Sequence, residues 1–540
     1  MSYWTMFHRS AIVATIMLVS TASALSEENK VAAAPKVDFS YAFVVPHRIT
    51  VGRPSASDRT LLNLQPKYLG MSWTYENLTM AHFPRLSYKI PRTDWNINVI
   101  PSIDGKPFDS SRWTRLEEVL PALENVYDDK LGLVRLEVIG GMTAALTRIE
   151  LVNSDSKPHQ FVVRCDSANV GENPAWVDWK RFVGDNLIAG WNERADRLLI
   201  LGLGADSYSL QADGRAPASK SMVLVWNLKP GEKRQGWIVR PYQSYVADLP
   251  KLRKHDWAQE MAEAKKEWCD IFVRMPKISI PDKEVLNAYI ACLADLFIMR
   301  EPLADGYIGG TPGVEQYRAA SSGEAAIVAV ALDQNNLHDE ALRGFKVSLD
   351  AQEPDGNWID YKGWARLMWF ASGFKTWMIM EHYRLTGDRK FLEEMYPCMV
   401  ASSRWQERQR ATMRPADGER PVTYGLMPRG FGDCGLNDDG DLYGVFFPHN
   451  VWSVYADKCT VEAAEILGKT ADLPELKKIY ETAHADLLTA LDRGSIREKD
   501  FRWIPGVPSK ICGSHWGALN VAFPCRLVPP EHELVTGTLR

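Results

Sequence analysis

A glycine- and aspartate-rich segment, YGLMPRGFGDCGLNDDGDLYGVFFPHN from Tyr424 to Asn450, carries the residues best suited to chemistry. Asp433 follows a glycine there, and glycine lets the backbone approach a ligand closely. The aromatic residues Phe431 and Phe447 could shield its carboxyl group from water, as the carboxyl groups of general acids often are. An aspartate in this setting can transfer a proton to a bound molecule, or it can hydrogen-bond its own turn.

The acidic run Asn437–Asp441 in the same segment could bind calcium, but its glycine is out of register for an EF-hand and the distal glutamate is missing. We therefore expect a solvated acidic turn, with Asp438 and Asp439 as alternative proton donors. The 8 cysteines show no zinc-ligand spacing, and the sequence has no phosphate loop, nucleophile elbow or HExxH motif. The sequence thus predicts neither a metal nor another cofactor.

Three polar residues flank this acidic region. Arg429 could match a carboxylate with two parallel hydrogen bonds, and His449 and Asn450 could hydrogen-bond a polar ligand. A structural salt bridge or a helix cap would explain each of them equally well.

The periodicity of the apolar residues divides the chain into the elements that would position these side chains. Residues 38–249 contain short alternating or apolar runs between turn residues, which predicts a large antiparallel β-sandwich. Residues 250–280 contain a charged amphipathic helix that we interpret as a linker. From residue 281 the period is helical, and the predicted helices cover about 281–297, 321–334, 337–352, 364–386, 389–410, 450–467 and 474–491, with one more beginning near Ser514. The segment that contains Asp433 therefore follows the fifth of these helices.

Composition and the amino terminus bear on the partners and the compartment. The 540 residues are 46% hydrophobic and 24% charged, which is ordinary for a soluble protein of two or three domains. A formal charge of −5 without a long basic run argues against a nucleic-acid partner. Residues 1–24 read as a signal peptide, and their apolar run is too short to span a membrane. We expect a secreted or periplasmic protein that has no membrane association after cleavage.

Three short sequence motifs in the helical part resemble those of a known superfamily. They are the acidic start of an apolar helix at Gly323–Asp333, the DGxW motif in Glu353–Trp358 and the YxxTGD motif in Glu381–Asp388. In their order, after a β-sandwich and a linker helix, they resemble the six-hairpin glycosidase superfamily, which includes glucoamylase-like, trehalase-like, α-glucosidase-I-like and rhamnosidase-like enzymes. The resemblance implies a supersandwich-like β domain followed by an (α/α)6 toroid, with residues 281–540 as the catalytic domain.

The resemblance assigns roles to acidic residues at two places. In this superfamily one catalytic carboxylate comes from the loop after the fifth helix and the other from a loop near the eleventh. Asp433 is then the expected general acid. A twelve-helix toroid needs more residues than follow residue 281, so the sequence suggests a truncated or incomplete toroid whose second carboxylate lies beyond Arg540.

The same resemblance predicts a sugar-binding end of the toroid. Glucoamylase-like proteins have Arg-Asp where this chain has Gly323 and Glu324, so a glucose-type subsite is not expected, although Arg318 could compensate. Glu324 would bind sugar hydroxyls or, alternatively, only favour the start of its helix. The candidate substrate-binding residues are Tyr317, Arg318, Glu324, Trp358, Asp360, Trp364, Arg429, His449, Asn450 and Trp516.

The expected activity is that of an inverting, exo-acting glycoside hydrolase on oligo- or polysaccharides. Such an enzyme needs one carboxylic acid to protonate the leaving oxygen and one carboxylate to activate water, about 6.5–9.5 Å apart. A polysaccharide lyase, a glycoside phosphorylase and a non-catalytic sugar-binding protein remain alternatives. The sequence predicts no particular sugar, linkage or oligomeric state.

Overall fold

The computed structural model describes residues 47–56, 58–73, 95–169, 187–189, 198–212, 220–242, 244–302, 308–311, 313, 322–349, 352–359 and 367–540. The signal peptide predicted over residues 1–24 lies outside these ranges. So do four candidate substrate-binding residues, Tyr317, Arg318, Asp360 and Trp364.

Two antiparallel sheets form the β part of the chain. The first has the strand order β1-β2-β3-β4-β10-β14-β13 with β5 paired to β4, and the second has the order β11-β12-β15-β9-β8-β7-β6. The first sheet comprises β1 (His47–Gly52), β2 (Arg59–Leu64), β3 (Leu69–Trp73), β4 (Trp95–Ile103), β5 (Lys106–Pro107), β10 (His159–Asn169), β13 (Ser207–Ala212) and β14 (Lys220–Leu228). The second comprises β6 (Arg112–Arg115), β7 (Leu123–Asp128), β8 (Gly132–Gly140), β9 (Ala144–Asn153), β11 (Leu187–Ala189), β12 (Leu198–Leu203) and β15 (Lys233–Pro241).

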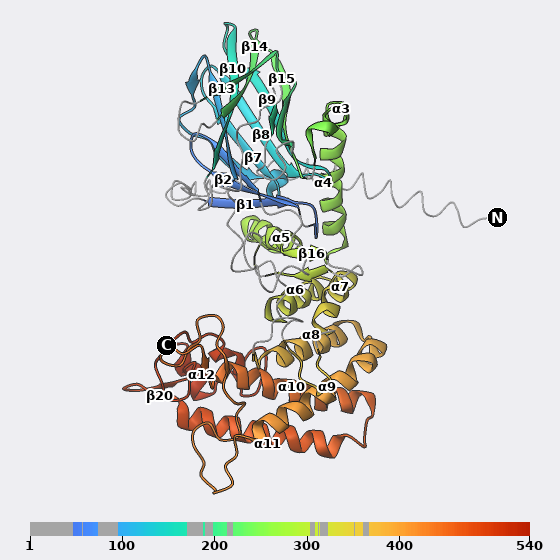
Figure 1. Cartoon of the computed structure of the whole chain (residues 1–540), viewed down its shortest axis with the longest axis vertical. Coiled ribbons are helices and arrows are strands. Elements are labelled where there is room, and N and C mark those ends of the chain that lie inside the picture. The colour runs from blue at the N-terminus through green and yellow to red at the C-terminus, as the bar shows by residue number, and fades with distance from the viewer. Residues whose placement is uncertain are drawn as a thin grey trace, which may run out of the picture. The chain divides into compact units, whose positions relative to one another are not determined.

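The two sheets pack face to face around a shared core (Figure 1). Alternate residues of β8, namely Val134, Leu136 and Val138, are fully buried in this core, as expected for a strand with one face turned inward. Phe161 of β10 and Leu224 of β14 meet them from the first sheet. The predicted antiparallel sandwich is therefore present.

A helical linker follows the sandwich, with the 3-10 helix Val246–Asp248, α3 (Leu249–Leu252) and α4 (Trp257–Arg274). Asp256 caps α4 by accepting a hydrogen bond from the backbone N–H of Gln259 at 2.9 Å. One face of α4 is buried in a cluster that also contains apolar residues of the second sheet. Glu260 of α4 reinforces this contact, because its carboxylate accepts from the backbone N–H of Thr143 at 2.8 Å.

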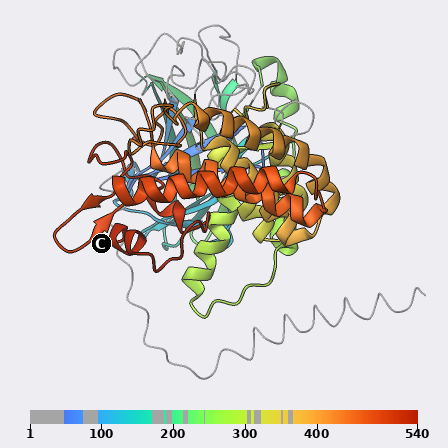
Figure 2. The same ribbon diagram turned by 90° about the horizontal axis from the view of Figure 1, so that it is seen from below.

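The carboxy-terminal part consists of helical hairpins. Its helices are α5 (Lys283–Ile298), α6 (Ser322–Gln334), α7 (His338–Leu349), α8 (Ala371–Thr386), α9 (Arg389–Ala411), α10 (Phe447–Leu467), α11 (Leu473–Gly494) and α12 (Glu533–Thr538). Helices α6, α8 and α10 pack side by side in one layer, and α7, α9 and α11 pack against them in a second. In Figure 2, seen from below, the orange-red α11 lies nearest the viewer, on the outside of the layers. The remaining short strands are β16 (Arg300–Pro302), β17 (Ile308–Gly310), β18 (Gly430–Phe431), β19 (Tyr443–Gly444), β20 (Ile496–Arg497) and β21 (Arg502–Trp503).

The predicted order of sandwich, linker helix and helical hairpins is confirmed. One predicted helix is wrong, because the chain near Ser514 forms turns and the short 3-10 helix Ala518–Val521. Gly513 and Gly517 have φ values of +59° and +75°, and these left-handed residues prevent a continuous helix. Within the described ranges, no helix combines the length and apolar character needed to cross a membrane.

Candidate functional site

The connection between α9 and α10 contains a small hairpin that holds the aspartate-rich segment. Strands β18 and β19 pair Gly430 with Gly444 and Phe431 with Tyr443. A Cβ atom added at Gly432 would collide with the backbone carbonyl of Leu436, so this close turn requires glycine. The glycines of the segment therefore bring its two sides close together around the candidate acid.

Asp433 follows the hairpin strand and is half-buried. Its backbone carbonyl accepts a hydrogen bond from the N–H of Leu436 at 2.9 Å, which closes the turn. Among the residues that the structure describes, none forms a hydrogen bond or ion pair with the Asp433 carboxylate. The turn is thus held by the main chain of Asp433, and its side chain is left available to a ligand.

Glu324 lies in the first turn of α6 and shares the surroundings of Asp433. Desolvation raises the pKa of the Cys434 thiol to about 12, and the negative charges of Asp433 and Glu324 add to this rise. Two carboxylates from separate elements therefore act on one thiol. The first turn of α6 and the loop after α9 thus both lie near Cys434, and we call Asp433 and Glu324 together the carboxylate site.

The carboxy-terminal segment around residue 514 is fastened to the same turn. Ser514 donates from its hydroxyl to the Cys434 carbonyl at 2.7 Å, and its N–H donates to the Gly435 carbonyl at 2.9 Å. Trp516 follows, half-buried, with its ring centroid 5.7 Å from that of Phe370. An indole is thereby placed beside the carboxylate site, where aromatic faces suit the apolar faces of sugar rings.

The two alternative acids have cationic partners. Lys510 forms ion pairs with both Asp438 and Asp439, and its own pKa is raised by these two carboxylates. Both carboxylates are therefore engaged by a side chain of the protein, unlike that of Asp433 within the described ranges. Asp438 and Asp439 also lie close enough to Cys512 to share a cation, but Lys510 already pairs with both carboxylates.

Arg429 is largely exposed and bonds to neighbouring residues of the hairpin. Its guanidinium pairs with Asp441 and donates to the backbone carbonyl of Tyr443 at 2.8 Å. These contacts fit the structural salt bridge that the sequence left open. Binding of a substrate carboxylate by Arg429 stays a prediction.

Asn450, in the first turn of α10, is buried, and its side chain hydrogen-bonds backbone atoms. Its side-chain oxygen accepts from the N–H of Met427 at 2.6 Å, and its side-chain nitrogen donates to the Phe446 carbonyl at 2.9 Å. It therefore fastens the loop to α10. Its role in sugar binding stays a prediction, and the sequence offered no signal for this burial.

His449 is fully buried between the rings of Phe370 and Phe446, with centroid distances of 5.2 Å to each. Within the described part of the chain neither ring nitrogen has a hydrogen-bond partner. Burial lowers the pKa of His449 to about 3, so the ring is neutral at physiological pH. A buried neutral imidazole of this kind affects stability whether or not it also contacts a ligand.

Replacing His449 with phenylalanine is expected to flatten the acid side of the stability–pH curve. Between the pKa of about 3 in the folded protein and the ordinary 6.5, the unfolded chain binds a proton that the folded chain does not, so stability is lost as the pH falls. At ~1.4 kcal/mol for each pH unit, the wild type should lose about 2–3 kcal/mol more than the variant between pH 7 and 4.5. Urea unfolding at several pH values measures this, and equal pH slopes would contradict it, since packing strain does not vary with pH.

Trp358 lies in the core. Its side chain is 2% exposed, and the Lys375 ammonium lies 5.6 Å from its ring centroid. This burial leaves little ring surface for stacking on a sugar, so the structure gives Trp358 a packing role.

The fold of this chain is similar to solved structures, although its sequence matches no known family. No protein-family model matches this chain, and no curated protein sequence matches it. Solved structures with a similar fold include one titled "Crystal structure of bacterial glucoamylase complexed with acarbose", with a TM-score of 0.55 and 10% sequence identity. The likeness covers 86% of this chain and 72% of that one. The chain therefore has a glucoamylase-like fold, in agreement with the resemblance to six-hairpin glycosidases.

Proposed function

We propose that this chain is an exported carbohydrate-active enzyme, an inverting and exo-acting glycoside hydrolase on oligo- or polysaccharides. The observation that carries the proposal is the carboxylate site, where Asp433 is half-buried, lies near Glu324 and has no side-chain partner among the described residues. The glucoamylase-like fold supports the same class of reaction. Export is supported by the sequence of residues 1–24.

The proposed chemistry gives each residue one task. Protonated Asp433 gives its proton to the glycosidic oxygen as the bond from that oxygen to the anomeric carbon breaks. Water attacks the anomeric carbon from the opposite face, and a second carboxylate takes a proton from that water. Glu324 accepts hydrogen bonds from sugar hydroxyls, and Trp516 packs on a sugar face.

A binding and turnover assay tests this function. The purified chain is titrated with acarbose and with neutral and acidic oligosaccharides while tryptophan fluorescence is recorded, and products are followed by NMR of the anomeric proton. We expect saturable binding and release of a single terminal sugar with inverted configuration. Retention of configuration would refute the inverting mechanism.

Three other outcomes would replace the proposal. Turnover that requires phosphate would identify a phosphorylase. An unsaturated, ultraviolet-absorbing product would identify a lyase. Binding without any turnover would identify a non-catalytic sugar-binding protein.

A further inference from the structure

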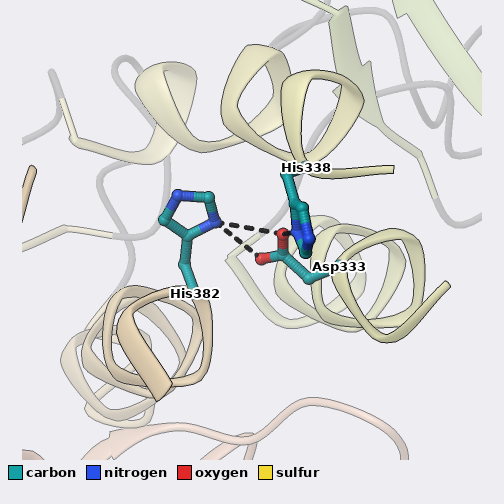
Figure 3. Close-up of side chains that lie close together, drawn as sticks. All are labelled: Asp333, His338 and His382. Carbon is teal, nitrogen blue, oxygen red and sulfur yellow. Dashed lines mark hydrogen bonds and ion pairs between the residues drawn. The ribbon is translucent and has the colours of Figure 1, made fainter. Parts of the chain in front are cut away.

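A second cluster of chemically active side chains lies apart from the carboxylate site. Asp333 of α6, His338 of α7 and His382 of α8 converge between the three helices, as Figure 3 shows. The Asp333 carboxylate lies 2.9 Å from Nδ1 of His338, and each of its oxygens lies 3.0 Å from Nδ1 of His382. We call these three residues the His-Asp cluster.

Local structure brings the first two residues together. The connection between α6 and α7 is short, and Asn336 within it has a left-handed φ of +58°. The N–H of Leu337 donates to the Leu332 carbonyl at 2.9 Å, which turns the chain back on itself. His338, the first residue of α7, is thereby returned to Asp333 near the end of α6.

Packing against α8 supplies and orients the third residue. The imidazole of His382 meets the rings of Phe345 and Phe391 edge to face, with centroid distances of 5.3 and 5.2 Å. These two aromatic side chains fix the ring orientation. Its Nδ1 atom consequently faces Asp333 in a set position.

The cluster places its carboxyl group in the protein interior. The side chain of Asp333 is 0% exposed and that of His382 is 2% exposed, whereas that of His338 is 32% exposed. Across the described ranges, no lysine or arginine forms an ion pair with Asp333. A carboxylate in the interior is costly unless hydrogen bonds or a nearby cation compensate it. The carboxyl ends of α6 and α8 add negative potential, which the amino end of α7 offsets in part.

The arrangement of the donor atoms fits a transition-metal ion. One carboxylate oxygen and two imidazole nitrogens, one from each residue, lie within 4.8 Å of one another. Two ligands held at the usual Zn–N and Zn–O lengths of about 2.0–2.2 Å are separated by about 2.9 Å at a right angle and about 3.4 Å at the tetrahedral angle. The observed N–O separations of 2.9 and 3.0 Å match the right-angle value and are roughly 0.4 Å short of the tetrahedral one, so the side chains move apart slightly to hold a tetrahedral ion. The partly exposed His338 leaves a side through which water could reach a further coordination position.

We propose that Asp333, His338 and His382 bind one divalent transition-metal ion, with Zn²⁺ as the expected occupant. The ion pairs with the buried carboxylate and ties α6, α7 and α8 together. Glu324 and Asp333 are separated by nine positions on α6, or about 13 Å at 1.5 Å per residue, so the ion has a structural role apart from the carboxylate site.

Metal titration of the whole chain tests the site. After treatment with a chelator, the protein is titrated with Zn²⁺ by calorimetry and with Co²⁺ by visible absorption. We expect one tight site per chain, a Co²⁺ spectrum typical of nitrogen and oxygen ligands, and a melting temperature that rises with Zn²⁺. Failure to bind either metal, or binding without any thermal stabilisation, would overturn the proposal.

Variants locate the binding. His338→Gln, at the most exposed ligand, should fold normally and bind Zn²⁺ at least tenfold more weakly, and Asp333→Asn should weaken it further. His484→Gln is the matched control, because it removes an imidazole of α11 that lies outside the cluster. In the described structure this ring hydrogen-bonds the Leu527 carbonyl at 3.0 Å and stacks on Tyr480. Equal affinity in His338→Gln and the wild type, or an equal loss in the control, would show that the metal binds elsewhere.

Discussion

Asparagine in place of Asp433 is expected to lower kcat/KM for glycoside hydrolysis by about 10²–10⁴-fold, the usual contribution of a positioned proton donor. An amide has nearly the same shape as a carboxyl group, but it cannot give a proton to the glycosidic oxygen. The turn should survive, because it is closed by the backbone carbonyl of Asp433 and not by the side chain. The melting temperature should therefore change little while turnover falls.

Asp439→Asn provides the matched control in the same loop. Its carboxylate is exposed and paired with Lys510 at 2.9 Å, so removing its charge should leave kcat/KM within about threefold of the wild type. Substrates with a good leaving group need less protonation, and the loss in Asp433→Asn should shrink for them. A large loss in Asp439→Asn with normal turnover in Asp433→Asn would transfer the acid role to the acidic turn.

The sequence predicted the fold well because the fold depends on patterns repeated along the chain. Alternation in β8 and helical spacing in α4 each involve many residues, so single exceptions do not hide them. The error near Ser514 arose where two glycines adopt left-handed angles within an apolar stretch. The polar and apolar pattern alone does not report such backbone angles.

The site was predictable only in part, since burial and pairing are tertiary properties. The segment around Asp433 was expected to be a loop after the fifth predicted helix, and the structure has a loop there between α9 and α10. Nothing near His449 or Trp358 in the sequence indicated that both would be buried. Lys510 is separated from Asp439 by 71 positions, and the His-Asp cluster draws on three helices without a ligand motif, so spacing could not find either.

A buried ion pair between α9 and α10 gives the largest expected effect on stability. Asp457 is 0% exposed and its carboxylate pairs with Nη2 of Arg410, itself 1% exposed, at 2.6 Å. Ser403 donates to the same carboxylate at 2.6 Å. Replacing Asp457 with alanine leaves the Arg410 charge buried without its main partner, which should cost about 3–5 kcal/mol of unfolding free energy. Urea unfolding followed by far-ultraviolet circular dichroism measures the loss.

The double variant Asp457→Leu, Arg410→Met separates the cost of an unpaired charge from the worth of the pair. Because both charges are removed together, no buried ion remains, and the double variant should be more stable than Asp457→Ala even though it carries more changes. Asp492→Ala is the control, since that carboxylate is 66% exposed in its pair with Arg502 and should cost less than about 1 kcal/mol. If Asp457→Ala cost no more than this surface control, the network between α9 and α10 would not hold these helices together. If the double variant had a lower unfolding free energy than Asp457→Ala, the ion pair itself would stabilise the helical layers. The loss in Asp457→Ala would then not come only from leaving a lone buried charge.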